Sequence, residues 1–233
     1  MSGGQERSDS GRYCGLRIPD PDQRRDLGVF VERALRLDPA AVVRLRMRSD
    51  GLLGAWVATG LDVLACRVVA GSSSPADVTY GADHLYRGLT EPGSPGVDAG
   101  LPMDSAWRGA LPGEAGFVHV DDVPATTVAE LARRGTDMAR EHGSAYGPPA
   151  SLLDSVVLEV RGGGTEVPVP LRCVLALTAL GFMPESAGCA PATEVVRVRA
   201  APSWLRIDAR FGSVFRRRGQ NVEFTIESAA ISR

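Results

Sequence analysis

The 233-residue chain contains no lysine, so all 26 of its basic residues are arginine. The absence excludes Schiff-base and pyridoxal-phosphate enzymes, which need a reactive lysine, and it excludes a Walker-A phosphate loop. Frequent Ala, Gly, Pro and Val are typical of a GC-rich genome, which explains the bias without selection at individual sites. Arginine stays charged at any working pH, so a cationic surface on this chain suits carboxylates and phosphates.

Cysteine and histidine are also scarce. The four cysteines lack the C-x-x-C spacing of zinc or redox sites, which predicts buried thiols at Cys66 and Cys173 rather than disulfides. His119, beside Asp121 and Asp122, belongs to the one cluster that could hold a metal. Because apolar residues flank His119 on both sides, we interpret it as a surface strand residue. We therefore predict no metal, no cofactor and no catalytic residue.

Long apolar runs are absent as well. No run approaches the length of a membrane span, and residues 1–25 are polar and charged, so we expect neither a signal peptide nor membrane association. We expect a cytoplasmic protein. The composition of residues 1–25 predicts a mobile N-terminal arm, and residues 228–233 are predicted to form a tail.

Residues 26–71 have the pattern of one α-β-β-β unit. Apolar residues recur at helical spacing after Asp26, a plausible helix cap, and Asp38-Pro39 ends the helix. Residues 42–48 then alternate between apolar side chains and arginines, as in a half-buried strand.

A hairpin follows this strand. Asp50-Gly51 favours a two-residue turn, because such turns need positive φ at both central positions. Counting back from that turn pairs Leu45 with Trp56 and Arg44 with Val57. The register predicts that Trp56 lies in the core against Leu45.

Residues 170–218 repeat the same order of elements. Pro170 opens a helix that is apolar nearly all round, and we expect it to be the most buried helix. A strand with the same Val-Val-Arg start and a strand carrying Trp204 follow it. These features are compatible with internal duplication and equally with two convergent amphipathic strands.

We predict an α+β fold of mostly antiparallel sheet with three or four helices on one face. A single domain is expected over residues 26–227, with possible α-β-β-β halves at 26–123 and 124–227. Between the two units, residues 90–116 are rich in Pro and Gly and show no periodicity. Segments of this kind are typically binding loops, lids or disordered regions, and three residues make a loop or lid of interest here: Asp104, Trp107 and Arg108.

Three runs in the chain resemble uncharacterised proteins of GC-rich actinobacteria. They are Phe117 to Pro124, Gly147 to Asp154 and Trp204 to Arg210. The resemblance covers much of the chain and implies no activity.

Charge is distributed unevenly. Residues 71–155 carry 12 acidic and five basic side chains, whereas residues 195–218 carry seven arginines against Asp208 alone. A loop at Ala201-Pro202 would place Arg197 opposite Arg206, and like charges in that position destabilise a strand pair. Either the acidic region and solvent neutralise this face, or it binds an anion or partner through four residues: Arg197, Arg199, Arg206 and Arg210.

These patterns favour a soluble binding or interaction protein that uses its arginine face. Its partner would be an acidic protein segment or a phosphorylated small molecule; nucleic acid is less favoured because the chain is acidic overall. One alternative is a small-molecule enzyme with a pocket under residues 90–116. Another is a homo-oligomeric structural protein in which the strand expected at Val222 to Ile226, or another edge strand, pairs with a second copy.

Overall fold

The computed structural model describes residues 15–91, 95–143, 147–183 and 194–219. Its N-terminal half contains these elements: β1 (Gly15–Arg17), α1 (Pro21–Leu37), β2 (Val42–Met47), β3 (Leu53–Thr59), β4 (Val63–Val69), β5 (Ser72–Ser74), β6 (Asp77–Gly81), α2 (Ala82–Thr90) and β7 (Gly96–Val97). The 3-10 helix η1 (Asp104–Ala106) follows. The C-terminal half contains β8 (Val118–Pro124), α3 (Ala125–His142), α4 (Ala150–Leu153), β9 (Val156–Gly162), β10 (Thr165–Pro170), α5 (Leu171–Ala179), β11 (Val195–Ala201), β12 (Trp204–Ala209) and β13 (Gly212–Arg217).

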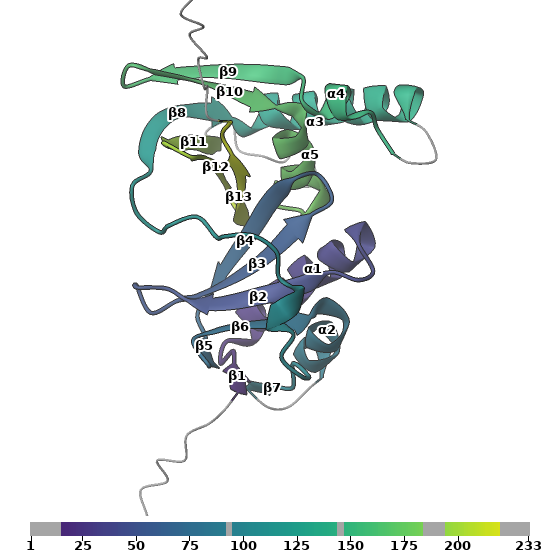
Figure 1. Ribbon diagram of the computed structural model, residues 1–233, viewed down its shortest axis with the longest axis vertical. Helices are drawn as coiled ribbons and strands as arrows, with labels where there is room; N and C mark the ends of the chain where they lie inside the picture. Colours follow the sequence, from purple (N-terminus) through teal and green to yellow (C-terminus); the bar gives the residue numbers. More distant parts are fainter. Residues whose placement is uncertain (1–14, 92–94, 144–146, 184–193, 220–233) are drawn as a thin grey trace, which may run out of the picture.

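One antiparallel sheet of eight strands joins the two halves, in the order β6-β2-β3-β4-β13-β12-β11-β8 (Figure 1). The halves meet where β4 pairs with β13, with Cys66 opposite Ser213 and Ala65 opposite Val214. Two smaller sheets, β5-β1-β7 and β10-β9, complete the described strands. The predicted α+β class with mostly antiparallel sheet is confirmed.

Both predicted α-β-β-β units are present: α1 with β2–β4, and α5 with β11–β13. The units meet at their last strands, so the strand order of one runs opposite to that of the other across the sheet. Five α-helices are described rather than three or four, because α2 follows β6 directly and a short helix, α4, follows Pro149. α5 is heavily buried, as its apolar pattern predicts.

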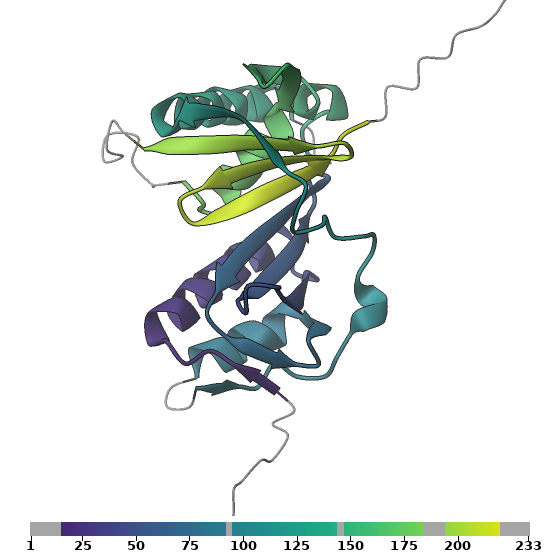
Figure 2. The same ribbon diagram turned by 90° about the vertical axis from the view of Figure 1, so that its left-hand side faces the viewer.

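The helices cover one face of the large sheet. α1 packs on β3 and β4, and α5 packs on β4 and β13, so one continuous core runs through both halves. Phe30 of α1 stacks on Phe182 after α5, with ring centroids 5.6 Å apart. The chain between η1 and β8 runs over the opposite side, away from α1 (Figure 2).

α1 begins earlier than Asp26. The Asp20 carboxylate accepts hydrogen bonds from the backbone N–H groups of Asp22 and Gln23, and Pro21 occupies the first helical position, where its missing N–H costs nothing. Part of the predicted arm, residues 15–25, therefore forms β1 and the start of α1. Residues 1–14 and 228–233 lie outside the described residues, as do Cys14, Cys189 and the strand expected at 222–226.

The predicted register of β2 and β3 is wrong by one residue. Arg44, not Leu45, lies opposite Trp56, and Leu45 lies opposite Ala55. The loop has three residues instead of two, because Arg48 N–H donates to the carbonyl of Leu52 and, of Asp50 and Gly51, only Gly51 has a positive φ. A shift of one residue reverses the faces of a strand, so Trp56 lies on the face opposite Leu45.

The predicted register of β11 and β12 is wrong by two residues. Val198 lies opposite Ile207 and Arg199 opposite Arg206, so the turn is Pro202-Ser203. Arg197 faces Asp208 instead of Arg206. The faces are preserved because a two-residue shift keeps each side chain on its predicted side.

Within the part of the chain that the structure describes, no helix has both the length and the apolar character needed to cross a membrane.

Candidate functional site

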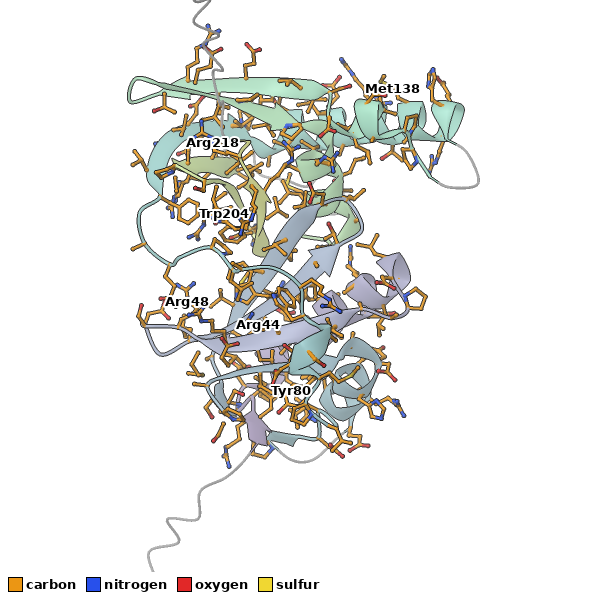
Figure 3. All side chains as sticks on the ribbon, in the orientation of Figure 1. Arg44, Arg48, Tyr80, Met138, Trp204 and Arg218 are labelled. Carbon is orange, nitrogen blue, oxygen red and sulfur yellow. The ribbon has the colours of Figure 1, made fainter. Side chains whose placement is uncertain are left out.

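The face of the large sheet opposite the helices, here called the outer face, carries both arginine-rich strands. One row of directly paired residues crosses all eight strands: Thr79, Arg44, Trp56, Cys66, Ser213, Asp208, Arg197 and Asp122. Directly paired residues share a face, so the arginines of β2 and of β11 lie on the same side. Figure 3 labels Arg44, Arg48 and Trp204 along this face.

Each of the four arginines predicted to bind an anion has a carboxylate within the protein. Arg197 Nε lies 3.0 Å from Asp122, Arg206 Nε 2.7 Å from Asp208, Arg199 3.5 Å from Asp208 and Arg210 3.6 Å from Glu194. Asp208 lies between the opposed Arg199 and Arg206 and neutralises part of their repulsion. These arginines do not need an external anion, and their role in binding stays a prediction.

Asp122 also brings His119 into this network. His119 Nε2 lies 3.0 Å from the Asp122 carboxylate, and hydrogen bonds from His119 and Arg197 hold the pKa of Asp122 below its usual value. The described residues contain no group of three His, Cys, Asp or Glu side chains that could hold a metal ion. His119 is a surface residue on β8, as predicted.

Residues 104–117, here called the outer segment, cross the outer face. The Asp104 carboxylate accepts a 2.7 Å hydrogen bond from Thr79 N–H, and the Arg44 guanidinium lies 5.8 Å from the centre of the Trp107 ring. Farther along, Phe117 packs edge-on against Phe215 at 6.0 Å. The outer segment therefore covers an aromatic cluster in the middle of the sheet.

Trp56 and Phe215 form the centre of that cluster, with ring centroids 4.9 Å apart. Trp56 is 7% exposed, which agrees with its predicted burial although its neighbours differ from those predicted. Cys66 lies beside it, and burial raises the pKa of its thiol from 9.0 to about 12. The thiol is therefore protonated at neutral pH and unsuited to act as a nucleophile.

Several small cavities lie beneath the outer segment. Trp107 and Asp104 line one of about 330 Å³, together with Arg44 and Asp77. Arg108 lines another of about 240 Å³ where the two halves meet, here called the junction cavity. Its other walls include Thr59, Asp62, Leu64, Trp204, Phe215 and Arg217.

Arg108 and Arg217 differ from the four predicted arginines. Among the described residues, neither has a carboxylate within 4.0 Å, while the Arg217 guanidinium lies 5.0 Å from the centre of the Trp204 ring. Both line the junction cavity. Arg108 was singled out from the sequence, but Arg217 was not, because it has no regular spacing to Arg108.

Two arginines tie the halves together reciprocally. Arg172 of α5 donates a 2.7 Å hydrogen bond to the carbonyl of Leu61 and lies 2.8 Å from the Asp154 carboxylate. Arg67 of β4 donates a 2.8 Å hydrogen bond to the carbonyl of Phe211 and pairs with Asp26 at 2.6 Å. Sequence reasoning missed both, because the contacts that cross between the halves, Arg172 to Leu61 and Arg67 to Phe211, join residues more than 100 positions apart.

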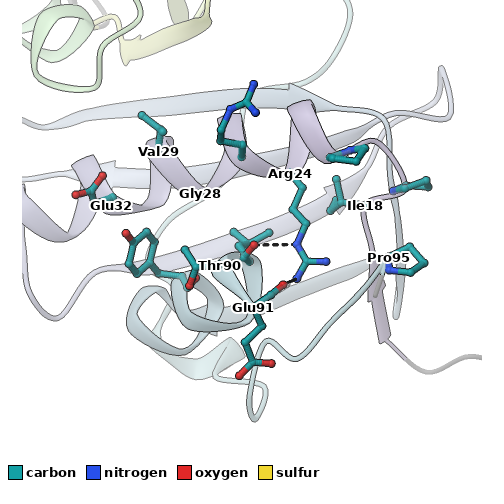
Figure 4. Close-up of a pocket in the computed structure, with 13 residues that line it drawn as sticks. Ile18, Arg24, Gly28, Val29, Glu32, Thr90, Glu91 and Pro95 are labelled. Atoms are coloured by element: carbon teal, nitrogen blue, oxygen red, sulfur yellow. Dashed lines mark hydrogen bonds between the residues drawn. The ribbon is translucent and has the colours of Figure 1, made fainter. Parts of the chain in front are cut away.

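A larger cavity, with a volume of about 710 Å³, lies on the helical side, between α1 and α2. Arg24 crosses from α1 to the C-terminal end of α2 and donates to the carbonyls of Gly88, Leu89 and Glu91 (Figure 4). Thr90 and Glu91 line it, so this cavity borders the first residues of the 90–116 segment. We call it the α1–α2 groove.

Comparison with family models gives two matches. Residues 13–109 match the model "Domain of unknown function (DUF8010)", and residues 112–221 match "Domain of unknown function (DUF8185)". The two matched ranges meet within the outer segment. Both descriptions agree with the predicted resemblance to an uncharacterised family. A search of the curated proteins found no match.

Solved structures similar to this chain are sliding clamps. A putative DNA polymerase III beta subunit from Eubacterium rectale has a TM-score of 0.56 and 10% identity over 94% of this chain and 68% of that one. The Helicobacter pylori beta clamp has a TM-score of 0.54 and 9% identity over 90% of this chain and 66% of that one. The chain spans 63% of the Caulobacter crescentus sliding clamp, at 15% identity over 83% of this chain and a TM-score of 0.49. At these identities the likeness concerns the fold.

Proposed function

We propose that the chain is a non-enzymatic structural protein that associates with copies of itself through the outer edge of β9. The observation that carries this proposal is a seven-residue strand that, among the described residues, pairs only with β10. A two-stranded sheet is marginally stable in water, and a further strand stabilises it.

The register shows which backbone groups β9 offers. Pro168 lies opposite Glu159, and proline has no N–H to donate. In an antiparallel pair, opposite residues either exchange both backbone hydrogen bonds or turn both away from each other. The Glu159–Pro168 pair therefore turns outward, so Glu159 offers an N–H and a C=O at the free edge, whereas Pro168 protects β10.

The two edges of the large sheet are less open. On β6, Thr79 N–H donates to Asp104 and its carbonyl accepts a 2.7 Å hydrogen bond from Met103 N–H. On β8, Asp121 and Asp122 add charge and the ladder with β11 is irregular, both of which discourage further pairing. β9 therefore has the least protected long edge among the described strands.

Fold likeness supports a structural role. The similar structures are DNA polymerase sliding clamps, and this chain spans 68% of the Eubacterium rectale protein.

Sedimentation equilibrium of three proteins tests the proposal. Wild type should self-associate, and Glu159→Pro, which removes the outward N–H of β9, should weaken association by about tenfold or more. Glu166→Pro is the matched control, because Glu166 lies on the β10 edge and pairs with Arg161 as Glu159 does. A monomeric wild type, or equal effects of the two substitutions, would contradict the proposal.

A second candidate function uses the junction cavity. Arg108 and Arg217 leave two guanidiniums without described carboxylate partners beside apolar walls, which suits an acidic segment of a partner protein. A labelled glutamate-rich peptide should bind in a salt-dependent way and lose affinity when both arginines are changed to Ala. Arg133→Ala on α3 is the control. Tighter binding of an oligonucleotide than of the peptide would replace the protein partner with nucleic acid.

A further inference from the structure

The α1–α2 groove has the size of a small-molecule site and mostly apolar walls. Its volume of about 710 Å³ lies inside the range of roughly 300–1,000 Å³ typical of ligand pockets. The apolar walls come from the chain before α1, from α1, from the end of α2 and from Pro95: Ile18, Pro19, Pro21, Val29, Leu89 and Pro95.

The groove is held open by a fixed cation. Arg24 Nε donates to the Leu89 carbonyl at 2.8 Å, and its Nη2 donates to the carbonyls of Gly88 at 2.6 Å and Glu91 at 2.8 Å (Figure 4). These carbonyls are the free acceptors at the C-terminal end of α2, where a cation is favourable. Arg24 therefore fixes the distance between the helices, and these donors are already in use.

Opposite charges lie about two turns apart on the α1 wall of the groove. Arg25 and Glu32 both line it and are seven positions apart on α1, which separates them by about 10 Å along the helix axis at about 1.5 Å per residue. Their present partners are Asp22, at 2.9 Å, and Arg36, at 2.6 Å. Exposed ion pairs within one helix contribute little to stability, so the charged groups of a ligand can take the place of Asp22 and Arg36 as partners.

We propose that the α1–α2 groove binds an extended apolar tripeptide with free termini. Three extended residues span about 10 Å, which matches the separation of Arg25 and Glu32. The carboxylate lies at Arg25, and the ammonium group lies at Glu32. The apolar side chains lie against Val29 and Leu89. This site is independent of the proposed self-association through β9.

Calorimetric titration with the tripeptide Leu-Val-Leu tests the site. The free peptide should bind, and either N-acetylation or C-amidation should weaken binding by about tenfold, because each removes one terminal charge. Arg25→Gln should abolish the difference between the free and amidated peptides. Glu32→Gln should abolish the difference between the free and acetylated peptides.

Two outcomes would overturn the proposal. One is that the free peptide gives no binding to wild type, and the other is that capped and free peptides bind equally. Arg133→Gln is the matched control, because Arg133 also forms an exposed pair four residues along its helix but lies on α3. It should leave the affinity for all three peptides unchanged.

Discussion

The hairpins β2–β3 and β11–β12 begin with the same alternation of apolar residues and arginines, yet their structures differ from expectation in different ways. The observed register of β2–β3 is shifted by one residue from the predicted register, so Trp56 lies on the other face of the sheet. The observed register of β11–β12 is shifted by two residues, so every side chain keeps its predicted face. The difference shows that alternation predicts which residues share a face, whereas loop length decides which face a strand presents relative to its partner.

Loop chemistry explains the two outcomes. In the first hairpin Arg48 lies 2.7 Å from the Asp50 carboxylate, which also accepts a 3.1 Å hydrogen bond from Leu52 N–H. These contacts stabilise a three-residue loop. In the second hairpin the turn is Pro202-Ser203, and no unusual contact is needed to keep the faces.

The largest expected effect tests the position of Trp56. Trp56→Ala should lower the free energy of unfolding by about 3–5 kcal/mol, because it empties a buried aromatic site. Trp204→Ala should cost less, because Trp204 is only half-buried at the start of β12. Urea unfolding measures both.

A double-mutant cycle sharpens this comparison. Trp56 and Phe215 should couple by about 0.5–1.5 kcal/mol, as contacting aromatic residues do. Trp56 and Leu45, on opposite faces, should be additive within about 0.5 kcal/mol. Coupling between Trp56 and Leu45, with additivity between Trp56 and Phe215, would instead support the two-residue loop and its predicted register.

The second effect concerns Arg172, one of the two arginines that join the halves. Arg172→Ala should lower the free energy of unfolding by about 1.5–3 kcal/mol, because charged hydrogen bonds are lost from a side chain that is 8% exposed. Asp62→Asn is the control and should change little, since Asp62 is 84% exposed and lies 3.8 Å from Arg172. Chemical denaturation of both variants should separate them. Equal effects would mean that the junction does not depend on the Leu61 and Asp154 contacts.

The smallest effect compares two buried thiols, that of Cys66 on the outer face of the sheet and that of Cys173 in α5 on the helical side. Burial raises the pKa of Cys66 and of Cys173 from 9.0 to about 12. Below pH 9 each thiol keeps its proton in both the folded and the unfolded state. Above it the unfolded thiol ionises first, so stability should fall by about 1 kcal/mol per thiol between pH 9 and pH 10.

The lysine-free sequence makes that measurement simpler, because no lysine titrates in this range. Replacing both cysteines with Ala should flatten the decline, leaving the contribution of tyrosines. A decline of the same size in wild type and in the double variant would show that the thiols are already exposed.

Much of the fold was predictable from local patterns. Helical spacing after Asp26 predicted α1, and the apolar run after Pro170 predicted the buried helix α5, because each pattern reflects one face packed on a core. Of the candidate site, Asp104, Trp107 and Arg108 were found because a loop rich in Pro and Gly rarely carries such residues without a contact. Each of them lines a cavity beneath the outer segment.

The partners of those residues were not predictable. Arg197 pairs with Asp122, so an acidic residue between 71 and 155 neutralises part of the arginine face. From the charge totals alone, neutralisation by the acidic region was one open interpretation, and binding of an anion or partner was the other. Only the order of strands, with β8 beside β11, brings Asp122 to Arg197.

By itself, the sequence determined the two α-β-β-β units, their amphipathic faces and the exclusion of lysine chemistry, because these depend on residue type and on spacing within one element. The tertiary structure alone decided that β4 pairs with β13, that both arginine-rich strands share the outer face and that Arg24 holds the α1–α2 groove. These features join residues far apart in the chain, and their positions follow from packing, which local periodicity does not encode.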